Sequence, residues 1–94
     1  MQTETRIETT SGSTYLRKLC RHFAHKVPAT VSNNQGIIEL QFGRCRINVA
    51  QDHLHCCVDV ENERQFTAAE QVITEHLTRM ARSEALSVQW VRHV

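Results

Sequence analysis

The segment His53-Leu54-His55-Cys56-Cys57-Val58-Asp59-Val60 decides the fold, because its side chains alternate in character. Successive side chains of a strand point to opposite faces of a sheet. We therefore expect one face of this strand to be buried against helices, carrying Leu54, Cys56, Val58 and Val60. The other face is expected to be polar and wet, carrying His53, His55, Cys57 and Asp59. One covered face and one wet face are typical of antiparallel sheets.

The rest of the chain supplies partners for this strand. Alternating or extended segments predict further strands at residues 3–9, 29–32, 37–42, 44–49 and 86–90, with the first at an edge of the sheet. Apolar residues at helical spacing predict helices at residues 14–25 and 66–82. The first helix follows Ser11, whose hydroxyl can cap free N–H groups, and ends before Pro28. The order β-α-β-β-β-β-α-β predicts an α+β fold, with two helices packed on one face of a mostly antiparallel sheet.

Size and composition narrow the class of protein. Ninety-four residues predict a single domain over residues 1–94. A formal net charge of +1 gives no overall attraction to nucleic acid. No apolar run reaches the roughly 18 residues of a membrane span, and the polar residues 1–6 lack the apolar core of a secretory signal. We therefore expect a cytoplasmic protein that has neither nucleic acid nor a membrane as a partner.

The cysteines are expected to be free thiols. The chain has no C-x-x-C pair, which removes the common redox and zinc motifs, and cytoplasmic thiols stay reduced. Cys20 and Cys45 are the candidate redox thiols, because arginines lie near both in the sequence and a nearby cation lowers a thiol pKa. Buried, unreactive thiols are the competing interpretation.

The first predicted helix is the segment richest in reactive side chains. In linear order Cys20, His22 and His25 look like a metal cluster. At about 100° per residue, Cys20 and His22 lie roughly 160° apart on a helix and cannot bind one ion together. The cysteine therefore belongs to the apolar stripe, and a polar flank remains. With His76 added from the second helix, the candidate ligand-binding residues are Tyr15, Lys18, His22, His25, Lys26 and His76.

Two interpretations of this flank stay open. His22 and His76 could simply pack their rings between the helices and keep their polar tips wet. The alternative is a site for an anion, because residues 11–38 contain no Asp or Glu and four positive side chains: Arg17, Lys18, Arg21 and Lys26. Lys18 and Lys26 would repel a divalent cation, so no metal is assigned.

The pattern Tyr15-Leu16-x-x-Leu19-Cys20-x-His22-Phe23-x-His25-Lys26, followed by Ile38-Glu39-Leu40-x-Phe42-Gly43-x-Cys45 and His76-Leu77-x-Arg79, resembles a bacterial family. It is the uncharacterised family called domain of unknown function 2218, and the likeness runs from the first strand to Trp90. Similar domains occur beside, or fused with, siderophore-interacting flavin reductases. The resemblance therefore implies a link to iron acquisition and a flavin reductase as partner, but no demonstrated activity. The matched positions are Tyr15, Cys20, His22, His25, Lys26, Gly43, Cys45 and His76.

Three functional hypotheses follow. No nucleophile, base and orienting group can be named together, so a non-catalytic protein is favoured over an enzyme, and no cofactor is assigned. The first hypothesis is a binding domain for a small anionic or iron-containing ligand, such as a ferric chelate, haem or released iron. The second is a thiol-based redox accessory to a reductase. The third is a protein-interaction module that docks through the open sheet face.

Overall fold

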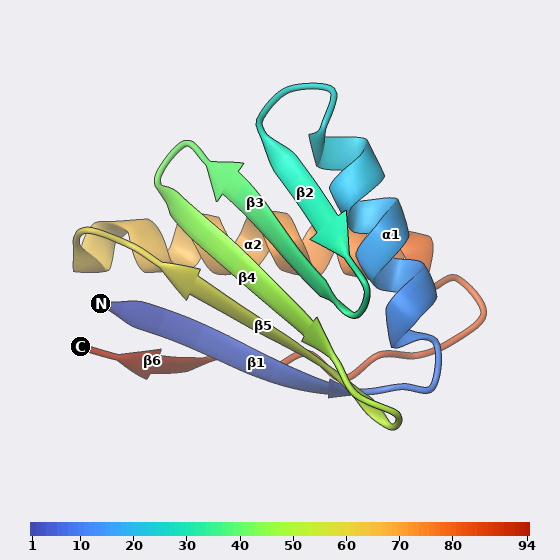
Figure 1. The fold of residues 1–94 in the computed structure, drawn as a ribbon. Helices are drawn as coiled ribbons and strands as arrows, with labels where there is room; N and C mark the ends of the chain where they lie inside the picture. Colours follow the sequence, from blue (N-terminus) through green and yellow to red (C-terminus); the bar gives the residue numbers. More distant parts are fainter.

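Two helices cover one face of a six-stranded sheet in the computed structural model, which describes residues 1–94 (Figure 1). The helices are α1 (Gly12–Phe23) and α2 (Phe66–Met80), and a short 3-10 helix, Glu63–Gln65, precedes α2. The strands are β1 (Gln2–Glu8), β2 (Ala29–Ser32), β3 (Gln35–Leu40), β4 (Gly43–Val49), β5 (His53–Asp59) and β6 (Val91–His93). The predicted element order and the α+β class are confirmed.

The sheet is antiparallel throughout, in the order β2-β3-β4-β5-β1-β6. The prediction that β1 is an edge strand is wrong, because β1 lies between β5 and β6. The last strand was also expected too early: residues 81–90 are irregular, and pairing with β1 starts only at Val91. Leu86, Val88 and Trp90 alternate because they pack, half-buried, against the core. Alternation alone did not distinguish that packing from a strand.

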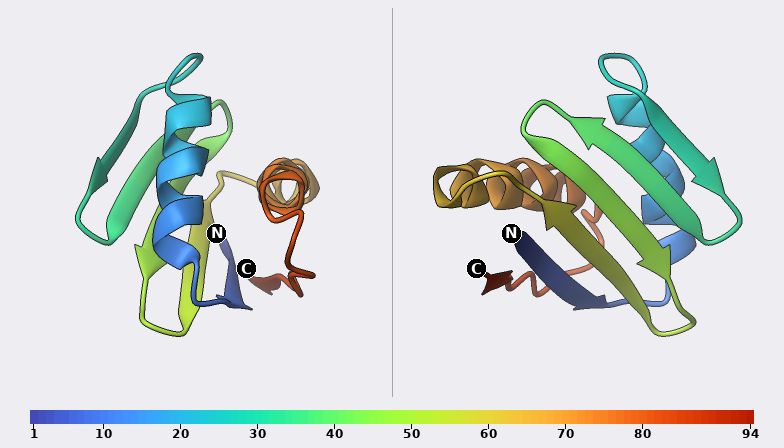
Figure 2. Two further views of the ribbon diagram at one scale, coloured as in Figure 1. Left: turned by 90° about the vertical axis from the view of Figure 1, so that its right-hand side faces the viewer. Right: turned by 60° about the vertical axis from the view of Figure 1, so that its left-hand side comes forward.

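The core lies between the sheet and the helices, and the right-hand view of Figure 2 shows both helices behind the sheet. On β5 the expected residues face the helices, since Leu54, Cys56 and Val58 are fully buried. The helices contribute the complementary apolar side chains, which are Leu16, Leu19 and Phe23 of α1 and Phe66, Ile73 and Leu77 of α2. Side chains of both helices and of the sheet therefore form one continuous apolar core.

The ends of the helices differ from the expected positions by about one half-turn. The first helix begins at Gly12, and the Ser11 side chain makes no capping bond; instead the Thr9 hydroxyl accepts from the Ser11 N–H. It ends at Phe23, whose carbonyl accepts from the backbone N–H groups of Lys26 and Val27. His25 and Lys26 therefore lie in the turn after the helix. The second helix ends at Met80.

Two glycines permit close approach of the backbone. A Cβ atom at Gly36 would lie 2.5 Å from Cδ1 of Leu16, so the absence of a side chain there lets α1 pack closely on β3. A Cβ atom at Gly43 would lie only 1.7 Å from the carbonyl oxygen of Asp59. The start of β4 therefore tolerates no side chain without movement of the end of β5.

We expect Gly43→Ala to lower the free energy of unfolding by about 3 kcal/mol or more, because the clash is with backbone and overpacking is costly. Gly36→Ala should cost less, since its contacts are side-chain atoms that can shift. Urea unfolding measures both effects. Gly12→Ala is the control: its Cβ would lie 3.1 Å from Val49 in the first turn of a helix, where alanine is favoured. Equal midpoints for the position 43 and position 12 variants would contradict this account.

Candidate functional site

Two of the predicted site residues, His22 and His76, meet across the contact between α1 and α2. Their Nε2 atoms lie 3.1 Å apart, and their ring centroids lie 4.6 Å apart. The Nδ1 atom of His76 lies 2.6 Å from the Val72 carbonyl oxygen, which can only accept, so this Nδ1 carries a proton. In the neutral pair, Nε2 of His76 is then the acceptor and Nε2–H of His22 the donor. The α2 backbone thus fixes the proton arrangement of both rings.

Positive or protonatable groups surround this histidine pair. The pKa of His22 is lowered first by partial burial and then by His76, Lys26, His25 and Arg79. No carboxylate is among these groups. We call these five residues, His22, His25, Lys26, His76 and Arg79, the seam patch, since they gather where α1 and α2 meet. Its electrostatic character suits an anion.

The other predicted site residues are placed differently. Lys18 is exposed on α1, and His25 is exposed in the turn after α1 without a hydrogen bond to the histidine pair. Tyr15 was expected on the same exposed flank, but only 5% of it is exposed. Its hydroxyl donates to Glu84, which also accepts from the Thr9 hydroxyl at 3.0 Å. The segment after α2 covers the start of α1 and so removes Tyr15 from the flank.

The candidate thiols lie inside the core. All four cysteines are free and buried. Cys45 is fully inaccessible on the covered face of β4, and Cys20 is 4% exposed, with its thiol 3.8 Å from the Thr30 carbonyl oxygen. Burial raises the pKa of both thiols, that of Cys45 strongly. Arginines that are near in the sequence do not offset this burial, so neither thiol is activated.

The histidines of the open sheet face are already engaged. His53 pairs with Asp52 at 2.9 Å, and His55 pairs with Glu4 at 3.0 Å. Cys57 lies under the guanidinium of Arg46, at 3.7 Å. No group of three or more His, Cys, Asp and Glu side chains is arranged to hold a metal ion anywhere in the chain.

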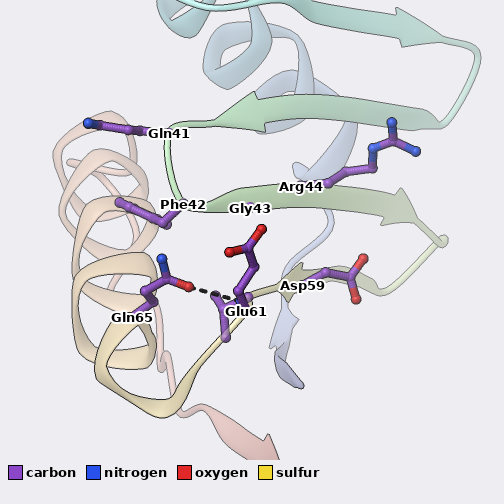
Figure 3. A pocket seen from close by; sticks show the side chains of 8 residues that line it. Gln41, Phe42, Gly43, Arg44, Asp59, Glu61 and Gln65 are labelled. Carbon is purple, nitrogen blue, oxygen red and sulfur yellow. Dashed lines mark hydrogen bonds between the residues drawn. The ribbon is translucent and has the colours of Figure 1, made fainter.

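A polar pocket that sequence reasoning missed lies at the β3–β4 turn (Figure 3). Its volume is about 320 Å³, and it is lined by Gln41, Phe42, Gly43, Arg44, Asp59, Val60, Glu61 and Gln65. Its charges are largely compensated, because Arg44 pairs with Glu39 at 2.5 Å and Asp59 with Arg46 at 3.3 Å. The glycine at position 43 was the one sequence signal for it. This pocket has no dominant charge with which to select a ligand.

Comparison with known proteins places the chain in a family. The family model for an uncharacterised protein conserved in bacteria, domain of unknown function 2218, matches residues 4–91. The chain belongs to this family, as its motifs indicated. A comparison with curated proteins gives no match.

The fold has a solved counterpart. The NMR structure of PA4090 from Pseudomonas aeruginosa is 27% identical in sequence and superposes with a TM-score of 0.80. The similarity covers 96% of this chain and 94% of that one.

No helix of this chain is long and apolar enough to cross a membrane.

The contact between Tyr15 and Glu84 predicts an alkaline dependence of stability. The carboxylate raises the pKa of Tyr15 to about 12. Because the raised value belongs to the folded state, this contribution is complete below the unfolded pKa of about 10 and is lost as the pH rises toward 12. We expect Tyr15→Phe to lose about 1 kcal/mol at neutral pH and to decline less steeply above pH ~10. Urea unfolding as a function of pH measures both.

Tyr15 is the single tyrosine of the chain, so ultraviolet absorbance reports its ionisation directly. Ionisation of the native protein near the ordinary tyrosine pKa would contradict the contact with Glu84.

The burial of the cysteines predicts slow thiol chemistry. In the folded protein we expect all four cysteines to react with an aromatic disulfide reagent more slowly than a cysteine peptide does, because they are inaccessible and the pKa of each is raised by burial. In urea all four should react at the rate of the peptide. A folded-state thiol faster than the peptide, identified by its loss in Cys20→Ser or Cys45→Ser, would overturn this expectation.

Proposed function

We propose that this chain is a small cytoplasmic, non-catalytic binding domain whose seam patch takes a small anionic ligand. The observation that carries the proposal is the contact between His22 and His76, which holds two imidazoles together among Lys26, His25 and Arg79. Phosphate and carboxylate are the chemical groups that such a patch recognises, through charge-assisted hydrogen bonds.

The histidine pair can respond to an anion by taking up a proton. In the neutral pair both Nε2 atoms and Nδ1 of His76 are engaged, so Nδ1 of His22 is the remaining basic position. A proton bound there makes His22 a cation without breaking its bond to His76. An anion would stabilise that cation and offset the positive neighbours that lower the pKa of His22. Binding should therefore strengthen as the pH falls through the His22 pKa.

This chemistry also defines how an iron-containing ligand would be recognised. The chain offers no set of three side chains for direct coordination, and Lys26 and Arg79 oppose a bare cation. A ferric chelate would instead be bound through the anionic oxygens of its chelator. The link to iron acquisition and to a flavin reductase partner is part of this proposal and is supported only by the resemblance of the motifs.

The two alternative functions have less support. A redox accessory needs an accessible thiolate, and burial works against one at Cys20 and Cys45. A docking module on the open sheet face needs uncompensated groups, whereas many of its charges pair with one another: Arg6 with Glu8, Arg44 with Glu39, and Arg46 with Asp59.

Histidine titration by NMR tests the proposal, with inorganic phosphate, citrate and ferric citrate as probes. Without probe, we expect the pKa of His22 to lie below its ordinary value of 6.5. At least one probe should raise it, and that probe should bind more tightly at pH ~5.5 than at pH ~7. The double substitution His22→Ala/Lys26→Ala should weaken binding by about tenfold or more, because two charged contacts are lost.

Arg64→Ala is the matched control, since it removes an exposed positive charge in the 3-10 helix before α2, away from His76, and should leave binding unchanged. Unaltered binding in the double variant, or no response of His22 to any of the three probes, would refute the proposal.

A further inference from the structure

A second feature lies on the opposite flank of α1, where β2 forms a free edge of the sheet. Only β3 pairs with β2, and α1 lies alongside β2 (Figure 1). The strand is Ala29-Thr30-Val31-Ser32 and carries no charge. Natural edge strands are usually protected by charges or by cover, because their unpaired backbone invites another strand. Here that protection is limited to the short length of the strand and to Pro28 before it.

The pattern of backbone hydrogen bonds between β2 and β3 shows which backbone groups of β2 are unpaired. The Glu39 N–H donates to the Pro28 carbonyl oxygen at 2.9 Å, so the carbonyl group of Pro28 points toward β3. Along an antiparallel pair of strands, every second residue is hydrogen-bonded to the neighbouring strand. The backbone N–H and C=O groups of Thr30 and Ser32 therefore also point toward β3. The N–H and C=O groups of Ala29 and Val31 therefore point away from the sheet. These two residues pair with the buried Ile38 and Gly36, so their side chains lie on the helix side.

A groove runs between this edge and α1. It has a volume of about 240 Å³ and is lined by Arg17, Cys20, Arg21, Ala24, Ala29 and Val31. Val31 is 45% exposed although it lies on the covered side of the sheet. The groove thus offers an apolar floor, two arginines on its helical wall and a row of free backbone groups on its other side.

The two arginines lack an acidic partner. The arginine ion pairs of the chain involve Arg6, Arg44, Arg46 and Arg92, and Arg17 donates only to the Ser13 hydroxyl. Residues four apart on a helix are separated by about 6 Å along the axis, and residues two apart on a strand by about 6.6 Å. Alternate side chains of an added strand could therefore reach Arg17 and Arg21 together.

We propose that this groove binds an extended acidic peptide segment of a partner protein. The segment pairs with Ala29 and Val31 as an additional strand and places alternate Asp or Glu side chains against Arg17 and Arg21. A second copy of this chain is a poor occupant. Two β2 edges related by a twofold axis would bring both arginine pairs to the same side of the joined sheet, and residues 11–38 hold no acid to offset them.

The test uses a fluorescein-labelled hexapeptide of alternating Glu and Thr, with fluorescence anisotropy for affinity and amide NMR spectra for location. We expect the amide signals of Ala29 and Val31 to shift and their hydrogen exchange to slow on binding. The double substitution Arg17→Glu/Arg21→Glu should weaken binding by about tenfold or more. Val31→Pro should also weaken it, because it removes an outward N–H and no bond of the ladder. Arg64→Glu is the charge control and should bind normally.

Two comparison peptides separate strand addition from loose charge attraction. A peptide of alternating Lys and Thr should not bind. A Glu–Thr peptide that is N-methylated on alternate residues keeps its charge but loses the donors that face β2, and it should bind at least tenfold more weakly. Equal binding of the methylated peptide, or dimerisation of the protein that protects Ala29 and Val31 without peptide, would overturn the proposal.

The outcome is independent of the seam patch. His22→Ala/Lys26→Ala should bind the acidic peptide as the unmodified protein does, and phosphate should not compete beyond its effect on ionic strength. Peptide-induced shifts confined to the seam patch would refute the edge site while leaving the anion proposal to its own test.

Discussion

The fold depends on one constraint: a single covered face of the sheet is shared between two helices. The first helix lies over β2, β3 and β4, and it packs closely because Gly36 has no side chain to hold Leu16 away. The second helix lies over the β1 side, where Glu70 accepts from the Thr3 hydroxyl at 2.6 Å. This division gives α1 two polar flanks. One meets α2 and holds His22 against His76, and the other borders the free edge of β2. Both proposed binding surfaces are consequences of that placement.

Two carboxylates join the C-terminal segment to the rest of the domain. The covered side of β1 and its continuation carry threonines, and most buried hydroxyls in proteins are hydrogen-bonded. Glu70 accepts from Thr3 and Glu84 from Thr9, while the Thr5 hydroxyl is buried without a partner. Glu70 also pairs with Arg92, whose guanidinium lies 5.2 Å from the centre of the Phe66 ring. The Arg92 guanidinium holds the pKa of Glu70 below its ordinary value. Polar contacts thus hold β6 and the segment after α2 against this side of the sheet.

The small net charge conceals an uneven distribution. On the open sheet face Glu4 contacts both His55 and His93, at 3.0 and 2.7 Å, and these contacts lower the pKa of Glu4. Other carboxylates of that face pair with arginines. The cations of α1 have no such partners: Arg17, Lys18 and Arg21 form no ion pair, and residues 11–38 contain no acid. A net charge of +1 is therefore a poor guide to what the surface of α1 attracts.

The sequence alone determined the class of fold, the inward residues of β5, the apolar stripe of α1 and the absence of a redox motif. These properties depend on local periodicity and spacing, which are visible in a few consecutive residues. It also indicated that His76 could join His22. Only the tertiary structure decided that β1 is an interior strand, because β6 returns to it from the other end of the chain. The same holds for Tyr15, whose partner Glu84 lies 69 residues away, and for the histidine contact itself. Such contacts depend on register and packing between distant segments. The same is true of the β2–β3 hydrogen-bond register, which leaves the backbone groups of Ala29 and Val31 unpaired at the edge.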